Sequence, residues 1–238
     1  MIDRAEPSHI VLESDGIAVT LAVRRNPRAR RVSLRADPAF GHIVLVLPGR
    51  ASLSAGMRFA HSQAAWIRGR LARMPPPNPI APGLRFELEG QPVTVAHDPS
   101  LRGSPRWTDG VLTIGGDEAF IARRVRDWIK RQARRTLQAR AEALAATLPR
   151  RVGALRIVDT RSRWGSCAAG GKLSFSWRLL LAPPAVLDYV VAHEVAHLVH
   201  PHHRPVFWEL VDRLTPHRRE AQAWLRRHGA QLLRFGLA

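Results

Sequence analysis

The sequence predicts an α+β fold in which a mostly β N-terminal part, containing one helix, precedes a helix-dominated C-terminal part. Short segments that alternate between polar and apolar residues dominate residues 17–114, and such alternation is typical of half-buried strands. Residues 117–148 contain neither proline nor glycine and carry apolar residues at helical spacing. A more apolar run at residues 185–197 indicates a buried helix. We therefore expect two domains, residues 1–116 and residues 117–238.

The N-terminal segments favour three strands and a helix. The expected strands are residues 17–23, 31–35 and 43–47, separated by loops that contain Asn-Pro and Asp-Pro pairs. Residues 52–74 favour a helix, with Phe59 and Ile67 among the residues of its inward face. The proline-rich tract at residues 74–79 then predicts a stiff, extended connector.

The middle of the chain favours a hairpin, one more strand and the longest helix. Residues 85–90 and 93–96 have the pattern of a hairpin, and residues 111–114 add a short strand. The helix expected at residues 117–148 opens with two acidic residues, which suit the positive end of a helix dipole. Its many arginines predict a solvated face rather than a binding site.

The last third of the chain favours two strands and three helices. The strands are expected at residues 156–158 and 172–177, joined by a glycine-rich turn. Besides the apolar run described above, residues 205–211 and 217–228 favour helices. No internal repeat is evident in the sequence.

The most informative feature is a His-Glu-x-x-His motif formed by His193, Glu194 and His197. On a helix, residues four positions apart lie on the same face, so both imidazoles can bind one cation with Glu194 beside them. A Pro-Pro pair just before the helix is tolerated at a helix start, and Pro201 marks a stop after it. The motif therefore lies on a helix with defined ends, as in zinc-dependent hydrolases.

Three histidines beyond the motif are candidates for a third metal ligand: His200, His202 and His203. His200 would lie about 10 Å along the axis from His193 if the helix continued, too far for one ion bound at about 2.1 Å. His203 lies beyond Pro201 and can fold back from a new direction, so we expect it to be the third ligand. His202, or a carboxylate from a later helix such as Glu209 or Glu220, is the alternative.

These residues predict a zinc-activated water as the nucleophile. Three neutral imidazoles leave a fourth coordination position for water, and Zn²⁺ lowers the pKa of that water to about 7. We expect Glu194 to take the proton as general base, so that hydroxide attacks a carbonyl group polarised by the metal. The predicted substrate is a peptide or protein.

Two other functions are compatible with the motif. A phosphate-containing substrate such as a nucleotide could be hydrolysed with the same metal and base, and the positive charge of the chain favours this variant. A non-enzymatic nucleic-acid-binding module with a structural zinc is the competing class. Structural zinc sites usually have four ligands rich in cysteine, whereas this sequence has one cysteine, far from the motif.

The motif and its flanking segments resemble the YgjP-like metallopeptidases, which are related to the SprT-like zinc proteases. The resemblance is carried by residues 161–167, 173–179 and 182–194, and by Phe207-Trp208 following His203. It is close over residues 158–214 and looser upstream to about residue 17. Two departures are Ser176, where the family pattern has Asn, and the histidine-rich stretch between His197 and His203. The resemblance implies a zincin-like catalytic part, built from a long helix, a short antiparallel sheet and the metal-binding helix.

Four other residues near the motif have ordinary structural interpretations. Residues 164–167 are expected to form a turn near the site, in which Cys167 is a small buried residue rather than a ligand. Arg163 and Arg178 could stabilise an oxyanion, but salt bridges are the commoner role of such arginines. Tyr189 is expected to lie in the core.

Composition indicates a soluble cytoplasmic protein with a basic surface. The single cysteine excludes an internal disulfide, and no apolar leader or membrane-spanning run is present in the sequence. The formal charge is +18, carried almost entirely by arginine, which suggests a compositional bias. We expect weak, non-specific nucleic-acid binding at most. The sequence predicts no oligomeric state.

Overall fold

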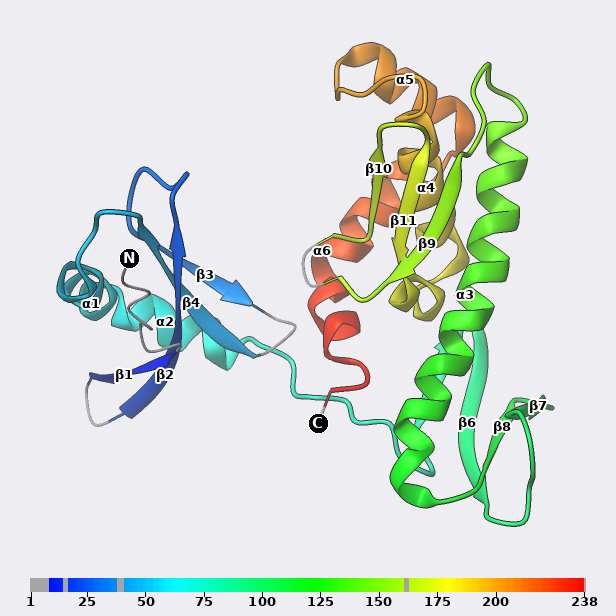
Figure 1. Ribbon diagram of the computed structural model, residues 1–238, viewed down its shortest axis with the longest axis horizontal. Coiled ribbons are helices and arrows are strands. Elements are labelled where there is room, and N and C mark those ends of the chain that lie inside the picture. The colour runs from blue at the N-terminus through cyan, green and yellow to red at the C-terminus, as the bar shows by residue number, and fades with distance from the viewer. Residues whose placement is uncertain (1–8, 15–16, 38–40, 161–162, 238) are drawn as a thin grey trace, which may run out of the picture. The chain divides into compact units, whose positions relative to one another are not determined.

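The computed structural model describes residues 9–14, 17–37, 41–160 and 163–237 (Figure 1). The chain divides into two compact units, Met1–Pro77 and Asn78–Ala238. Both contain helices and small sheets, so the fold is α+β as predicted, and a β-rich part comes first. The division lies nearer the N-terminus than the domain boundary expected after residue 116. Residues 78–116 join the second unit because Leu88, Val95 and Ile114 share its core.

The first unit is a four-stranded sheet with two helices. Its elements are β1 (His9–Ser14), β2 (Ile17–Asn26), β3 (Ser33–Asp37), β4 (His42–Pro48), α1 (Leu53–Ser62) and α2 (Ala64–Ala72). The strand order is β1-β2-β4-β3, with β2 and β4 parallel and the other pairs antiparallel. Leu21, Ile43 and Ile67 pack in its core. The single helix expected over residues 52–74 is two helices that meet at Gln63, and β1 was not expected.

The second unit begins with a sheet of the same topology. Its strands are β5 (Arg85–Leu88), β6 (Gln91–Asp98), β7 (Arg106–Thr108) and β8 (Val111–Gly115). Their order is β5-β6-β8-β7, with β6 and β8 parallel and the other pairs antiparallel. Each of the two sheets is followed along the chain by helix. The chain therefore contains a structural repeat that its sequence does not reveal.

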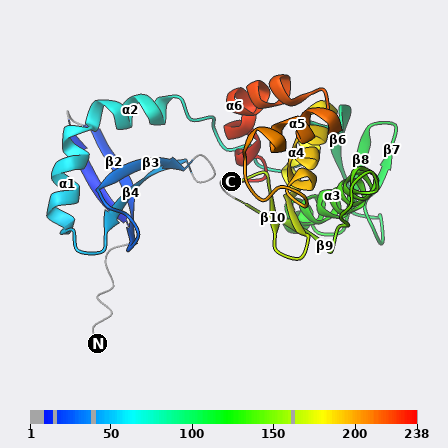
Figure 2. The same ribbon diagram turned by 90° about the horizontal axis from the view of Figure 1, so that it is seen from above.

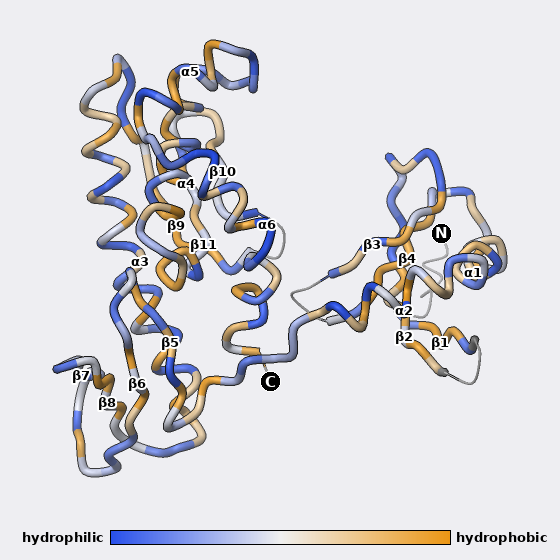
Figure 3. Tube along the Cα trace, turned by 180° about the vertical axis from the view of Figure 1, so that it is seen from behind, coloured by the Kyte–Doolittle hydropathy of each residue, from blue (hydrophilic) through white to orange (hydrophobic). Residues whose placement is uncertain are grey.

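Helix α3 (Ile121–Ala145) follows a short 3₁₀ turn, η1 (Glu118–Phe120). The Asp117 carboxylate caps this turn by accepting a hydrogen bond from the Ala119 amide at 2.9 Å. Buried residues recur along one stripe of α3, including Val125, Ile129 and Leu137, while its polar residues alternate with them in Figure 3. No helix in the described ranges is long and apolar enough to cross a membrane.

A small three-stranded sheet lies beside the motif helix. Its strands are β9 (Ala154–Val158), β10 (Gly165–Ala168) and β11 (Lys172–Ser176), in the order β10-β11-β9. An antiparallel sheet was expected. The sheet is mixed, because β9 pairs parallel with β11 while β10 pairs antiparallel with it. The expected turn at residues 164–167 is wrong: Gly165–Ala168 is an edge strand. The expected glycine-rich turn is confirmed: the chain reverses at Gly170 and Gly171, whose φ angles of +73° and +69° suit glycine.

The motif lies on α4 (Pro184–Ala196), at the centre of the helical part. The 3₁₀ turn η2 (Trp177–Leu181) precedes α4. Helices α5 (Pro205–Leu214) and α6 (Arg218–Arg234) follow it. Helix α4 contacts α3, α5, α6 and β10, and Figure 2 shows these elements around it. Its apolar residues are therefore buried on nearly every side. Pro183 and Pro184 were expected just before the helix, and in the structure Pro183 precedes it while Pro184 is its first residue.

Candidate metal centre

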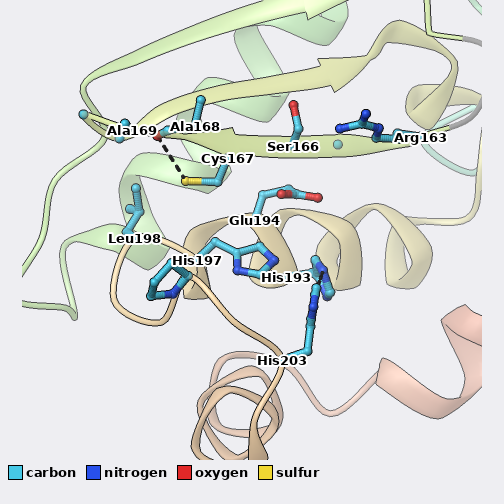
Figure 4. A pocket seen from close by; sticks show the side chains of 14 residues that line it. Arg163, Ser166, Cys167, Ala168, Ala169, His193, Glu194, His197, Leu198 and His203 are labelled. Carbon is cyan, nitrogen blue, oxygen red and sulfur yellow. Dashed lines mark hydrogen bonds between the residues drawn. The ribbon is translucent and has the colours of Figure 1, made fainter. Parts of the chain in front are cut away.

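Three histidine side chains converge at the C-terminal end of α4. His193 lies in its last turn and His197 at its C-cap, with ring centroids 5.0 Å apart. After Pro201 the chain turns back, and His203 Nε2 lies 3.2 Å from His193 Nε2. One ring nitrogen from each histidine lies within 4.8 Å of the other two (Figure 4). These three residues are the only set among the described residues whose donor atoms are grouped closely enough to hold a metal ion.

The spacing fits one transition-metal ion. Two nitrogens bound at about 2.1 Å to one tetrahedral ion lie roughly 3.4 Å apart. The 3.2 Å between His193 Nε2 and His203 Nε2 is close to this value, so an ion can take the place of a hydrogen shared between the rings. Neutral imidazoles suit zinc and neighbouring transition metals rather than calcium or magnesium.

The histidine pKa values favour the neutral, ligand-competent form. Burial, followed by the neighbouring His197 and His203, lowers the pKa of His193 to about 4. Burial also lowers the pKa of His197. The carbonyl oxygen of His200 lies 2.9 Å from His197 Nδ1, which can donate to it and leave Nε2 for a metal. The His200 ring itself packs against His202, outside the group of three.

Side chains of helix α5 pack against the three histidine rings. The buried Phe207 ring lies 4.5 Å from the His197 ring and 4.7 Å from the His203 ring, measured between centroids. The indole N–H of Trp208 donates to the His203 carbonyl at 3.1 Å and holds the returning loop. Phe207 and Trp208 thus fix the ring orientations. In the sequence this pair was recognised only as part of the family pattern, and its packing against the histidine rings was not predicted.

Glu194 lies between the three rings and β10, in the wall of the same cavity (Figure 4). Its residue is only 6% exposed. Burial raises the pKa of its carboxyl to about 7, against the opposing positive charge of Arg163. A carboxyl group with a pKa near neutrality can both accept and release a proton at physiological pH.

The absence of a side chain at Gly165 creates the room for Glu194. A Cβ at this position would lie 2.6 Å from Glu194 Cγ and 2.7 Å from its Oε1, closer than real contacts allow. Gly165 has no unusual φ angle, so close approach rather than backbone freedom requires glycine here. Gly165 is not among the site residues predicted from the sequence. A glycine in a strand that faces the motif would indicate a close approach to it, but residues 164–167 were expected to form a turn and not a strand.

The metal centre opens into a cavity of about 600 Å³ between β10 and the end of α4. Its walls include Gly165, Cys167, His193, Glu194 and His203. The Trp164 carbonyl accepts a hydrogen bond from the Ser176 amide at 2.9 Å, which makes these residues a bonded pair of the β10–β11 ladder. Bonded and non-bonded pairs alternate in an antiparallel ladder, so the main-chain groups of Gly165 and Cys167 point to the open edge.

The other residues that the sequence singled out lie outside the group of three histidines. Cys167 is half-buried in the cavity wall, outside the group of metal-compatible residues, and burial followed by Glu194 raises the pKa of its thiol. Tyr189 is buried as expected and is hydrogen-bonded to Gln222 at 2.9 Å. Arg163 is exposed at the cavity wall. Glu209 and Glu220 are exposed and outside the group of three, and Arg161 and Ser162 lie outside the described residues.

Arg178 is a structural residue. It is 4% exposed, pairs with Asp159 and donates to the Phe235 carbonyl from Nε at 3.3 Å. Its guanidinium also lies 4.4 Å from the centre of the Trp177 ring. Although burial opposes the change, these contacts with Arg178 lower the pKa of Asp159. Arg178 therefore anchors the C-terminal residues to the sheet and does not line the cavity at the metal centre.

Comparison with known proteins gives one match. The model of the family described as "YgjP-like, metallopeptidase domain" matches residues 30–228, which is most of the chain. No curated protein and no solved structure shows significant similarity to the chain.

The raised pKa of Glu194 predicts a pH-dependent stability difference in metal-free protein. The folded-state pKa of about 7 exceeds the ordinary value of 4.5, so the wild type loses stability as pH rises through this interval. Glu194→Gln lacks this loss and should be more stable by up to about 3 kcal/mol at pH 8, with little difference at pH 4.

Urea unfolding of chelator-treated protein at several pH values measures this difference. Titration of His193 changes the free energy of unfolding of the wild type and of Glu194→Gln alike, so it cancels in their difference. A difference between the variant and the wild type that stays constant from pH 4 to pH 8 would contradict the assigned burial of Glu194.

Proposed function

The chain belongs to the YgjP-like metallopeptidase family, and we propose that it is a zinc-dependent peptidase in which His193, His197 and His203 hold the metal and Glu194 is the general base. The observation that carries this proposal is the convergence of three imidazole nitrogens within 4.8 Å, next to a buried carboxyl group. When bound, zinc acts as a Lewis acid that lowers the pKa of water and polarises the carbonyl group under attack.

Glu194 handles the proton in this proposal. Its carboxylate accepts a proton from the attacking water and afterwards delivers it to the amine that leaves. In the metal-free protein the pKa of Glu194 is about 7. The positive charge of zinc would lower this pKa and favour the ionised form, which accepts the proton.

The open edge of β10 orients the substrate. An extended peptide can add to a sheet edge through main-chain hydrogen bonds, and Gly165 and Cys167 offer the groups for such pairing. Because Gly165 also touches Glu194, a peptide paired here has its backbone beside the general base. A purely structural zinc would call for four protein ligands, whereas the group described here has three.

The first prediction concerns metal retention. His203→Ala should weaken zinc binding by more than about 100-fold, since loss of a direct ligand costs at least as much as loss of a supporting contact. His202→Ala, one residue away and outside the ligand group, is the matched control and should bind zinc like the wild type. Chelator competition and elemental analysis measure both. Full zinc retention by His203→Ala would remove His203 from the metal site.

The second prediction concerns turnover. Glu194→Gln keeps the shape of the side chain but removes the proton acceptor, so hydrolysis of a denatured protein should fall by about 10²–10⁴-fold with zinc content unchanged. Hydrolysis by the variant at the wild-type rate would mean that the activity comes from elsewhere. Loss of zinc or of the fold would show that Glu194 is structural.

The third prediction concerns the glycine opposite the base. The methyl group of Gly165→Ala overlaps Glu194, so the carboxylate must move, and turnover should fall by roughly 10²-fold while zinc content is retained. Gly69→Ala is the matched control, because its methyl group would meet only Arg73, at 3.8 Å. Wild-type turnover in Gly165→Ala would show that the position of Glu194 is not critical.

A further inference from the structure

Two smaller cavities adjoin the one at the metal centre and share walls with it. A cavity of about 400 Å³ shares Gly165, His193 and Glu194 with it and extends towards α6. A cavity of about 370 Å³ shares Gly170, Gly171 and Leu198 with it, at the turn beyond β10. We call the three together the long groove. It runs along β10 and, beyond the β10–β11 turn, continues towards the residues that precede β9.

Arginines lie at both ends of the long groove. Arg163 and Arg226 line it where β10 begins, and Arg150 and Arg151 line it beyond the β10–β11 turn. All four are exposed, and none forms a salt bridge with a carboxylate in the described part of the chain. By contrast, Arg140, Arg178 and Arg218 are each paired with an aspartate. The positive charge at the groove ends is therefore available to a ligand.

Negative charge within the long groove is confined to its centre. Glu194 is the one carboxylate residue among its described lining residues, and it lies beside the metal centre. At the far end, Glu142 is a carboxylate that could pair with Arg151, since both line a separate cavity. Glu142 instead accepts a hydrogen bond from Gln138 at 2.9 Å. A ligand with negative charges on both sides of the reacting bond meets opposite charge at both ends.

The shape of the groove selects a peptide among anionic ligands. The edge of β10 presents main-chain N–H and C=O groups at strand spacing, which match the backbone of an extended peptide, whereas a nucleic-acid backbone carries no amide groups. A strand rises about 3.3 Å per residue, so Ala168, where β10 ends, lies roughly 10 Å from Gly165, or about three substrate residues from the bond opposite Glu194. Arg150 and Arg151 lie beyond this point, past the β10–β11 turn. At the other end Arg163 is only two residues from Gly165.

We propose that the long groove binds extended acidic peptides, with acidic residues within about two positions of the cleaved bond on one side and at least about four positions away on the other. Arg163 and Arg226 contact the near acidic residues, and Arg150 and Arg151 contact the far ones. The proposal rests on the proposed peptidase function and adds the substrate class to it.

The test measures binding to zinc-loaded, full-length Glu194→Gln, which should not cleave its ligand. Two labelled twelve-residue peptides differ only in that one carries Glu where the other carries Gln. Each exposed ion pair is worth about 1.4-fold to fivefold in affinity, so the Glu peptide, which meets four arginines, should bind about tenfold more tightly at low salt. This preference should shrink as ionic strength rises.

Charge-neutralising variants locate the effect. Adding Arg150→Gln and Arg151→Gln should reduce the preference for the Glu peptide to within about threefold, without changing the affinity for the Gln peptide. Adding Arg131→Gln and Arg134→Gln on the exposed face of α3 removes the same charge outside the groove, and should leave the preference intact. Equal losses in both variants would overturn the proposal in favour of general electrostatic attraction, and so would the absence of any preference.

Two further measurements separate this proposal from the peptidase function. If wild-type protein cleaves both peptides with equal kcat/KM, the peptidase function stands and the acidic preference fails. If the Glu peptide binds through Arg150 and Arg151 but the wild type cleaves no peptide, the binding class stands and the peptidase function fails. If a single-stranded oligonucleotide or a nucleotide depends on these arginines and the Glu peptide does not, the groove binds phosphates and the proposal is overturned.

Discussion

The contact between Glu194 and Gly165 joins α4 to β10, and the geometry of the candidate site depends on it. The carboxylate fills the space that any other residue at position 165 would occupy. Helix α4 cannot shift to relieve this contact, because it is surrounded by α3, α5 and α6. The same contact buries the carboxyl group, which raises its pKa to about 7, and keeps the open strand edge beside it. In the proposed mechanism, this one close approach sets both the protonation of Glu194 and the position of the substrate backbone.

Features determined by local sequence were predictable. The motif helix follows from its apolar run and its flanking prolines, and the i, i+4 spacing of His193 and His197 follows from helical geometry. Features that depend on distant partners were not. Gly165–Ala168 is a strand only because β11 pairs with it, and its Gly-Ser-Cys-Ala sequence has no alternation to reveal that. The parallel pairing of β9 with β11 and the repeated topology of the two four-stranded sheets have the same origin in long-range contacts.

The arginines divide into two classes that the sequence could not separate. The formal charge of +18 suggested a general basic surface. In the structure, Arg178 is buried against Asp159 and the C-terminal residues, where its role is to hold the fold. Arg150, Arg151, Arg163 and Arg226 line the long groove without carboxylate partners in the described ranges. Position relative to the site, and not the number of arginines, therefore carries the functional information.

X-ray absorption at the zinc edge of the loaded wild-type protein tests the central claim most directly, because it reports the ligand atoms themselves. The account predicts three imidazole nitrogens and one oxygen from solvent at about 2.0–2.1 Å, and no sulfur. His203→Ala should lose one imidazole from this set or fail to load. A sulfur neighbour at about 2.3 Å would bring Cys167 into the coordination sphere, and four protein ligands would indicate a closed, structural site. Either result would contradict a hydrolytic centre built from His193, His197 and His203.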